Sequence, residues 1–194
     1  QRFLFSTELI TPVQMAKGEI EWNIFESASA QFSNKPIYLN DSASTVDEII
    51  ARITLNAQAD KCDIAFIDYL GLMESEQHYD NRALEVGVIS RGLKLMAKEM
   101  HVPILCCAQL SRATESRTDK RPILSDLRES GAIEQDADSV MFLYRDEYYN
   151  ENSEDKGIAE CIIAKNRHGE TGTVKLQWLP QYTTFADREW KHVQ

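Results

Sequence analysis

The stretch Asp126 to Asp138, which reads DLRESGAIEQDAD, is the most informative part of this 194-residue chain. It is rich in charged side chains, contains an Arg-Glu-Ser-Gly turn and leads directly into the apolar run 139–144. Carrying so many charges into a buried strand is costly unless something binds them. The stretch therefore predicts a binding loop placed next to a strand of the protein core.

Patterns on either side of this loop predict helices and strands. Thr45 and Glu48 have the spacing of a capping box. Helices are expected over 19–32, from Ser44 or Thr45 to 59, and over 82–100. Strands are expected over 2–5, 36–39, 64–67, 104–108, 139–144, 158–165 and 173–179, with a glycine-containing turn over 167–172. Because the run 64–67 is apolar throughout, burial on both of its faces is expected.

The order of these elements predicts the fold class. Strands alternate with helices in the first part of the chain, and hairpins follow in the last part. This order is typical of an α/β protein with a mostly parallel central sheet, flanking helices and antiparallel C-terminal strands. With 194 residues, of which 43% are hydrophobic, the chain has about the length of one domain and can bury a sizeable core.

Composition also limits the cellular setting. No apolar run reaches the roughly 18 residues that span a membrane, and no charged-then-apolar leader opens the chain, so a cytoplasmic protein with no membrane partner is expected. The histidines lack zinc spacing and are assigned no metal role. Since none of the cysteines forms a CxxC pair, buried free thiols are expected at Cys62, Cys106, Cys107 and Cys161.

The charge of the chain is distributed unevenly. A formal net charge of −10 argues against a general nucleic-acid binder. The segment 109–128 is an exception, because its five basic residues outnumber its three acidic ones. The basic residues are Arg112, Arg117, Lys120, Arg121 and Arg128. Such a local excess fits a ring that confines its basic groups to a central channel, and an ordinary solvated loop is the alternative.

Three polar residues follow apolar runs, at the strand ends where ligands bind in parallel sheets. Asp68 is placed where a lone carboxylate holds Mg²⁺ through water, and capping of the next turn is the alternative. Glu8 can orient or deprotonate an attacking water, or it is a surface or helix-start residue. Gln109 can sense a γ-phosphate and report its loss to the adjoining loop, or it bonds to local backbone.

Two cations lie at the turn that follows the strand 158–165. Lys165 and Arg167 are spaced so that both can project into the nucleotide of a neighbouring subunit. Arginine fingers of this kind stabilise charge on a transferring phosphoryl group. A solubilising basic hairpin is the alternative.

The Arg-Glu-Ser-Gly turn is a candidate DNA contact. Arg128, Glu129, Ser130 and Gly131 form this site, in which Arg128 can contact a phosphate and Gly131 lets backbone N–H groups approach a strand closely. Such contacts do not depend on base sequence, as a translocating motor requires. Glu129 does not suit a phosphate and is expected to pair with a basic residue of a neighbouring loop.

Six strings together resemble the C-terminal motor domain of DnaB-type replicative DNA helicases, from about residue 2 to residue 187, with 188–194 as a tail. They are FSTEL (5–9), IAFIDYLGLM (64–73), VPILCCAQLSR (102–112), KRPILSDLRESGAIEQDAD (120–138), MFLYRDEYYN (141–150) and AKNRHGETGTV (164–174). The resemblance implies a RecA-like P-loop NTPase core and a homo-hexameric ring that uses ATP and Mg²⁺ to move along single-stranded DNA and unwind the duplex. It also implies primase and a helicase loader as partners.

The resemblance also implies residue roles. By position, Glu8 matches the catalytic glutamate, Asp68 the Walker B aspartate and Gln109 the phosphate-sensing glutamine of the family. Lys165 and Arg167 match the pair that reaches the adjacent subunit's nucleotide.

Two channel loops are implied as well. Arg128, Glu129, Ser130 and Gly131 lie in the family's loop that follows the DNA backbone, and the range from Met73 to Asn81 matches a second, more variable loop.

The chain departs from the family pattern in ways that leave other functions open. No phosphate-binding string of the type GxxxxGK[ST] occurs, the family's helical N-terminal domain is missing, and the region around Ala16–Lys17 is shorter by roughly a helix and a loop. A P-loop-less fragment or degenerate homologue that only binds DNA or a partner is therefore the alternative function. A RecA-like relative acting in recombination or circadian timing is a third.

Overall fold

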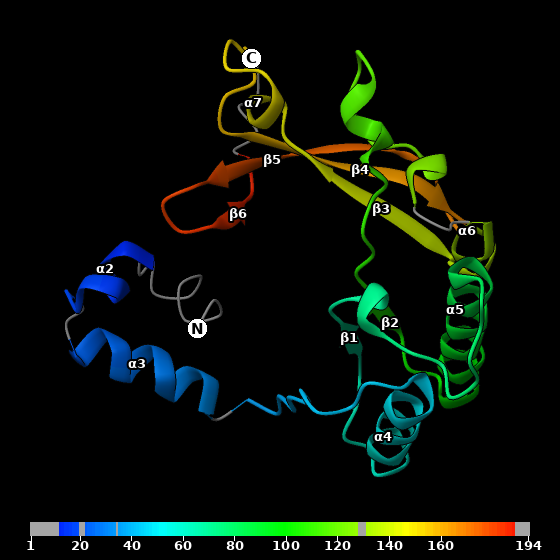
Figure 1. The fold of residues 1–194 in the computed structure, drawn as a ribbon. Helices are drawn as coiled ribbons and strands as arrows, with labels where there is room; N and C mark the ends of the chain where they lie inside the picture. Colours follow the sequence, from blue (N-terminus) through cyan, green and yellow to red (C-terminus); the bar gives the residue numbers. More distant parts are fainter. Residues whose placement is uncertain (1–11, 20–21, 34, 128–130, 189–194) are drawn as a thin grey trace. The chain divides into compact units, whose positions relative to one another are not determined.

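A computed structural model describes residues 12–19, 22–33, 35–127 and 131–188 of the chain (Figure 1). It divides into two compact units. Unit 1 comprises residues 1–38, 143–162 and 172–194, and unit 2 comprises residues 39–142 and 163–171.

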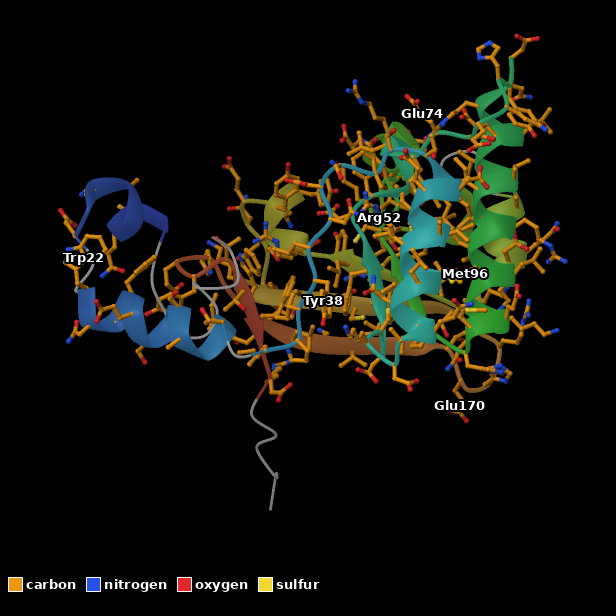
Figure 2. The ribbon with its side chains drawn as sticks, turned by 90° about the horizontal axis from the view of Figure 1, so that it is seen from below. Trp22, Tyr38, Arg52, Glu74, Met96 and Glu170 are labelled. Carbon is orange, nitrogen blue, oxygen red and sulfur yellow. The ribbon has the colours of Figure 1, made fainter. Side chains whose placement is uncertain are left out.

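Unit 2 contains a parallel strand pair covered by two helices. β1 (Ala65–Ile67) pairs with β2 (Ile104–Cys106), so that Ile67 lies opposite Cys106. The helices are α4 (Val46–Gln58) and α5 (Arg82–Met100), and Figure 2 shows them side by side, with Arg52 labelled on α4 and Met96 on α5. Their apolar faces and the strands form one core, made of Val46, Ile67, Leu70, Met73, Val86, Ile89 and Leu93.

Both helices begin at a capping residue, and for α4 this residue was predicted. The Thr45 Oγ1 accepts a hydrogen bond from the N–H of Glu48 at 3.3 Å, and the Glu48 carboxylate accepts from the N–H of Thr45, which completes the predicted capping box. The backbone N–H groups of Ser44 and Thr45 both donate to the Glu48 carboxylate and lower the pKa of that carboxyl. The Asn81 side chain caps α5 by accepting from the N–H of Ala83.

The prediction that the run 64–67 is buried on both faces is wrong in this chain. Ala65 and Ile67 are 9% exposed, but Phe66 between them is 69% exposed. Successive side chains of a strand point to opposite faces, and the core of unit 2 covers only one of them. Within unit 2, the face of the pair that carries Phe66 and Leu105 is therefore left uncovered.

Short helical segments fill the connections of unit 2. They are η1 (Leu70–Leu72), η2 (Arg112–Ser116), η3 (Leu124–Asp126) and α6 (Gly131–Asp136). α6 packs on α5 (Figure 1), and a Cβ added at Gly87 of α5 would lie 3.2 Å from the Cβ of Ala132. A larger residue at Gly87 would push the two helices apart.

A second sheet has four strands in the order β3–β4–β5–β6. They are β3 (Ser139–Tyr144), β4 (Ile158–Asn166), β5 (Gly172–Leu179) and β6 (Thr184–Ala186). β5 and β6 are antiparallel, with Trp178 opposite Phe185, as predicted for the end of the chain. The helix α7 (Asp146–Tyr149) follows β3, and the predicted bounds of β3, β4 and β5 agree with the structure to within one residue.

The N-terminal predictions agree less well. α2 (Pro12–Lys17) was not anticipated, and α3 (Trp22–Ser33) covers most of the helix predicted over 19–32. The predicted strand 36–39 is wrong, since this segment pairs with no strand of the described chain, and Leu39 is 85% exposed. The predicted strand 2–5 lies outside the described residues.

The four cysteines are free thiols, as predicted, but the prediction that they are buried is wrong. Cys107 is exposed, and Cys62, Cys106 and Cys161 are half-buried. Partial burial, aided by the neighbouring Cys107, raises the pKa of the Cys106 thiol to about 12. Within the described residues, no helix is long and apolar enough to cross a membrane.

Replacing Ile89 by valine tests the core of unit 2. Ile89 is the largest fully buried side chain there, so loss of one methylene in Ile89→Val should lower the free energy of unfolding by about 1 kcal/mol. Urea unfolding of the protein followed by circular dichroism measures this change. Val88→Ala is the control, because Val88 is 43% exposed and its change should stay within about 0.5 kcal/mol. Equal losses in both variants would contradict the assigned core.

Candidate nucleotide and DNA site

Asp68 and Gln109 lie at the same edge of unit 2. They follow the parallel strands β1 and β2, whose carboxyl ends are joined by a hydrogen bond from the N–H of Cys107 to the carbonyl of Ile67 at 2.9 Å. The chain after Asp68 returns to this edge, because the N–H of Leu70 donates to the carbonyl of Cys107 at 2.9 Å. The peptide bond between Asp68 and Tyr69 is cis. Both candidate residues therefore lie at the end of the sheet where ligands bind.

The side chains of Asp68 and Gln109 are exposed, and neither has a hydrogen-bond partner in the described part of the chain. η1 has Tyr69 at its N-cap and no side-chain cap, so Asp68 does not cap the following turn. Neither Asp68 nor Gln109 hydrogen-bonds to a described residue, so Gln109 is not tied to local backbone there. An exposed carboxylate and an exposed amide at a strand edge can both bind a ligand from outside the chain.

The donor set at this edge fits Mg²⁺ better than a metal that needs a full protein cage. Among the described residues, no group of three or more His, Cys, Asp or Glu side chains is placed to hold a metal ion. Mg²⁺ needs only one or two protein carboxylates and takes its remaining oxygens from water and phosphate. Asp68 is suited to that role, directly or through water.

The loop between Gln109 and the Arg-Glu-Ser-Gly turn is closed at its base. Leu110 and Leu127 form an antiparallel bridge, and the N–H of Ser111 donates to the carbonyl of Asp126 at 2.7 Å. The chain that leaves Gln109 therefore lies beside the chain that enters residue 128.

An ion pair holds this loop from within. Arg117 donates through Nη1 and Nη2 to the two carboxylate oxygens of Asp126, at 2.7 and 2.6 Å. Asp126 is only 2% exposed and also accepts from the N–H of Ile123 at 2.8 Å. The Arg117 guanidinium and this N–H hold the pKa of the Asp126 carboxyl below its usual range. Arg117, counted above as a candidate channel cation, is thus committed to the fold.

The other end of the charged stretch is bound by α5. The Ser90 Oγ donates to Asp136 at 3.0 Å, and Arg91 lies 3.3 Å from the same carboxylate. The Lys94 ammonium donates to Asp138, which lowers the pKa of that carboxyl, and Arg167 adds to the effect. Asp126, Asp136 and Asp138 therefore all find partners inside unit 2, so a bound ligand is not needed to explain these three charges.

The candidate DNA-binding residues are only partly described. Arg128, Glu129 and Ser130 lie outside the described residues, as does the expected pairing of Glu129. Gly131 is exposed and begins α6, and a Cβ added there would meet no atom within 4 Å. No part of the described chain therefore requires glycine at position 131.

The second candidate channel loop is also held at its base. Arg82 donates to the Glu85 carboxylate at 2.7 Å and to the carbonyls of Gly71 and Met73, each at 3.0 Å. Glu85 in turn accepts from the N–H of Ser75 at 3.0 Å, and this bond is the main cause of its lowered pKa. The segment from Met73 to Asn81 thus starts from a fixed anchor.

Lys165 binds the end of α6. Its Nζ donates to the carbonyl oxygens of Glu134 and Ala137, the latter at 2.8 Å. The last carbonyls of a helix have no partner within the helix, and a lysine satisfies them well. In this structure Lys165 is half-buried and acts as a cap for the end of α6.

Arg167 binds the same region more loosely. It donates to the carbonyl of Gln135 at 3.0 Å and lies 3.3 Å from the Asp138 carboxylate, while its own N–H donates to the Asp138 carbonyl. Its side chain is 47% exposed. Ion pairs this exposed contribute little stability, so Arg167 can exchange these partners for a stronger anion. Glu8, the remaining predicted catalytic residue, lies outside the described residues.

Unit 1 carries an aromatic and cationic cluster that the sequence analysis missed. The Arg145 guanidinium stacks 4.4 Å from the centre of the Trp178 ring, and the ring of Tyr148, a residue that is 72% exposed, is centred 5.8 Å from the same guanidinium. A cavity of about 200 Å³ lies beside them. Trp178 Nε1 is buried without a hydrogen-bond partner in the described chain. Aromatic faces next to an arginine bind planar rings by stacking.

The parallel pair β1–β2, flanked by helices and followed by antiparallel strands, makes this an α/β protein with polar residues at the ends of its parallel strands. Residues 1–187 match the family model described as "DnaB-like helicase C terminal domain". The chain belongs to this family, so the predicted family and fold class are confirmed.

Relatives agree with this assignment. The chain is 46% identical over 180 residues to the replicative DNA helicase DnaB of Pasteurella multocida, covering 90% of this chain and 38% of the relative. It is 47% identical to the DnaB helicase of Geobacillus stearothermophilus, covering 87% and 38%. The chain thus spans about two fifths of the length of these relatives.

Solved structures are similar as well. One of them, described as an ATPase domain, matches with a TM-score of 0.91 and 40% identity, over 97% of this chain and 69% of that one. Another is titled "The Structure Of A DnaB-Like Replicative Helicase And Its Interactions With Primase", and it also matches with a TM-score of 0.91 and 40% identity. The second match covers 97% of this chain and 47% of that chain.

The Asp126 ion pair predicts a specific pH dependence. Because its folded pKa is lowered, Asp126 stabilises the protein above its unfolded pKa of about 4, and this stability is lost as the pH falls through the folded value. Asp126→Asn should therefore be less stable than the wild type at pH 7, and the gap should close below about pH 4. Urea unfolding across this range measures the gap. Asp41→Asn, which alters an exposed carboxylate, is the control, and a gap for Asp126→Asn that stays constant with pH would contradict the prediction.

Proposed function

We propose that this chain is the motor domain of a replicative DNA helicase, which couples ATP hydrolysis to translocation on single-stranded DNA and to duplex unwinding. The observation that carries the proposal is the loop base where Leu110 pairs with Leu127. It joins the strand end that presents Gln109 to the segment that resembles the family's DNA loop. Such a motor requires that a residue sensing the nucleotide, here Gln109, is connected structurally to the segment that binds DNA. We assign residues 1–187 to this domain and 188–194 to a tail.

ATP with Mg²⁺ is the proposed substrate of the edge formed by β1 and β2. Asp68 would hold Mg²⁺ through water, and the ion neutralises charge on the phosphates when it is bound. Gln109 would contact the γ-phosphate through its exposed amide. Glu8 would orient or deprotonate the attacking water. The exposed positions of Asp68 and Gln109 support these roles.

Unit 1 by itself carries a candidate surface for a flat heterocyclic ring. We assign such a ring to the face formed by Arg145, Tyr148 and Trp178, because stacking on aromatic rings and on a guanidinium suits a flat heterocycle. The adjacent cavity of about 200 Å³ leaves room for a ring of that size.

Catalysis is proposed to need a neighbouring subunit in a homo-hexamer. Arg167 would leave Gln135 and Asp138 for the γ-phosphate of the adjacent subunit, where it stabilises the charge of the transition state. Lys165 is assigned to the same pair, although its two carbonyl contacts hold it more firmly. The half-exposed position of Arg167 supports its ability to move.

Single-stranded DNA, primase and a helicase loader are the proposed partners. Arg128, Ser130 and Gly131 would follow the DNA backbone, with Glu129 paired to a neighbouring loop. Primase is proposed because a similar solved structure, of a DnaB-like replicative helicase, is described by its title as showing interactions with primase. A cytoplasmic location is proposed from the replicative role of the relatives.

The alternative is a binding module without hydrolysis. The observation in its favour is that the sequence contains no GxxxxGK[ST] string to cradle phosphates. ATP hydrolysis by the 194-residue polypeptide itself, stimulated by single-stranded DNA, would exclude this alternative. The same assay on the full-length polypeptide tests the helicase assignment.

Mixing two inactive variants of the full-length polypeptide tests catalysis across the subunit interface. Arg167→Ala and Asp68→Asn should each lower ATP turnover by about 10³-fold or more, because each removes charge stabilisation at the phosphates. Mixed rings should regain turnover, since some interfaces combine an intact Asp68 with an intact Arg167 from the neighbour. Steady-state ATPase assays of the mixtures measure this recovery.

Arg91→Ala is the matched control for Arg167→Ala. Arg91 also lies 3.3 Å from a carboxylate of the same stretch, that of Asp136, and it is exposed. Its turnover should stay near the wild-type value. Mixtures that never exceed the turnover of the two separate variants would contradict action between subunits.

Arg128→Ala tests the DNA contact. If Arg128 binds a backbone phosphate, its loss should weaken single-strand binding equally for all sequences and reduce the slope of log K against log salt by about 0.7–1. Fluorescence anisotropy with labelled oligonucleotides at several salt concentrations measures both effects. An unchanged slope, or a loss of affinity for only some sequences, would remove Arg128 from the phosphate contacts.

A further inference from the structure

The loop 110–127 connects the two halves of the proposed motor. It begins directly after Gln109 and ends directly before the segment assigned to DNA. The bridge between Leu110 and Leu127 and the hydrogen bond from Ser111 to the Asp126 carbonyl bring its two ends together. The chain that leaves Gln109 and the chain that reaches Leu127 are therefore held side by side at the base of the loop.

The Arg117–Asp126 ion pair adds a side-chain connection inside the loop 110–127. Both oxygens of the carboxylate are bound by the guanidinium fork, and Arg117 Nη2 also donates to the carbonyl of Arg121 at 2.8 Å. The carbonyl of Asp126 accepts from the N–H of Ser111, so Ser111 holds the main chain of Asp126 and Arg117 holds its side chain. A bidentate pair of this kind fixes direction as well as distance.

We propose that Arg117 and Asp126 are positioning residues that couple the nucleotide state sensed at Gln109 to the DNA affinity of the segment beyond Leu127. The inference rests on the proposed function, since it takes Gln109 as the nucleotide sensor. Neither residue touches nucleotide or DNA in this role. Without the ion pair the loop retains its ends but loses the rigid connection between them, so the two binding events become independent.

The simpler interpretation of Arg117 is a direct phosphate contact, because it belongs to the basic segment 109–128. The geometry disfavours this interpretation. Nη1 and Nη2 are both bound to Asp126, and Nε donates to the carbonyl of Asp119 at 3.3 Å. The two interpretations differ in a measurable way, since only a phosphate contact changes the salt dependence of DNA binding.

The test measures how a nucleotide changes DNA affinity in the full-length polypeptide. Binding of a labelled thymidine oligonucleotide is followed by anisotropy at several salt concentrations, with and without a non-hydrolysable ATP analogue. The ratio of the two affinities is the coupling factor, and in Arg117→Met it should fall at least about fivefold toward 1. The salt slope should equal that of the wild type. Arg91→Met, which loses a comparable contact to Asp136 in the same unit, should keep the wild-type factor.

A second variant covers the case in which Arg117→Met does not fold. Arg117→Lys keeps the charge but loses the fork, so its coupling factor should fall by about threefold. A wild-type coupling factor in whichever variant folds overturns the proposal, and so does a salt slope reduced by about 0.7, which identifies a phosphate contact. If the wild type shows neither nucleotide-dependent DNA binding nor DNA-stimulated hydrolysis, the proposed function itself fails, and this inference fails with it.

Discussion

Pairing of the carboxylates in the stretch 126–138 is the constraint on which the rest of unit 2 depends. Charged groups beside a core strand destabilise a fold unless each has a partner. Asp126 has Arg117, and Asp136 and Asp138 have side chains of α5. The pairs of Asp136 and Asp138 hold the end of α6 and the residue before β3 against α5, and the pair of Asp126 holds the loop after Gln109 from within. The candidate sites are therefore consequences of how one acidic stretch is neutralised.

Regular elements were predictable where local patterns act alone. The bounds of α5 were predicted correctly, because its apolar spacing is local to that stretch of sequence. The capping box of Thr45 and Glu48 was predicted for the same reason. The segment 36–39 has the composition of a strand, but a strand also needs a neighbour, and composition does not report whether one exists. α6 was missed because its sequence reads as a polar loop, and contacts with α5 and Lys165 stabilise it instead.

The sequence predicted which polar residues lie at the strand ends, but not which side chains pair with one another around them. Asp68 and Gln109 could be placed together because both follow apolar runs of a parallel sheet. That Arg117 pairs with Asp126 could not be foreseen, since any of five cations in the segment 109–128 could have done so. The cluster of Arg145 and Trp178 joins residues far apart in the sequence, and only the strand pairing brings them into contact. Long-range pairing of side chains is thus the part of the site that a single sequence does not reveal.

The open face of the pair β1 and β2 affects how this polypeptide behaves in solution. Phe66 and Leu105 lie opposite each other on neighbouring strands, and Ile64 is exposed just before β1. Together they form an apolar patch on the surface of unit 2. Between molecules, the main long-range force opposing contact of such patches is the repulsion due to the net charge of −10. That repulsion vanishes near the isoelectric point of about 4.9 and is screened beyond roughly 8 Å at physiological salt. The colloidal stability of the isolated domain is therefore governed by the acidity and salt of its buffer, apart from the stability of its fold.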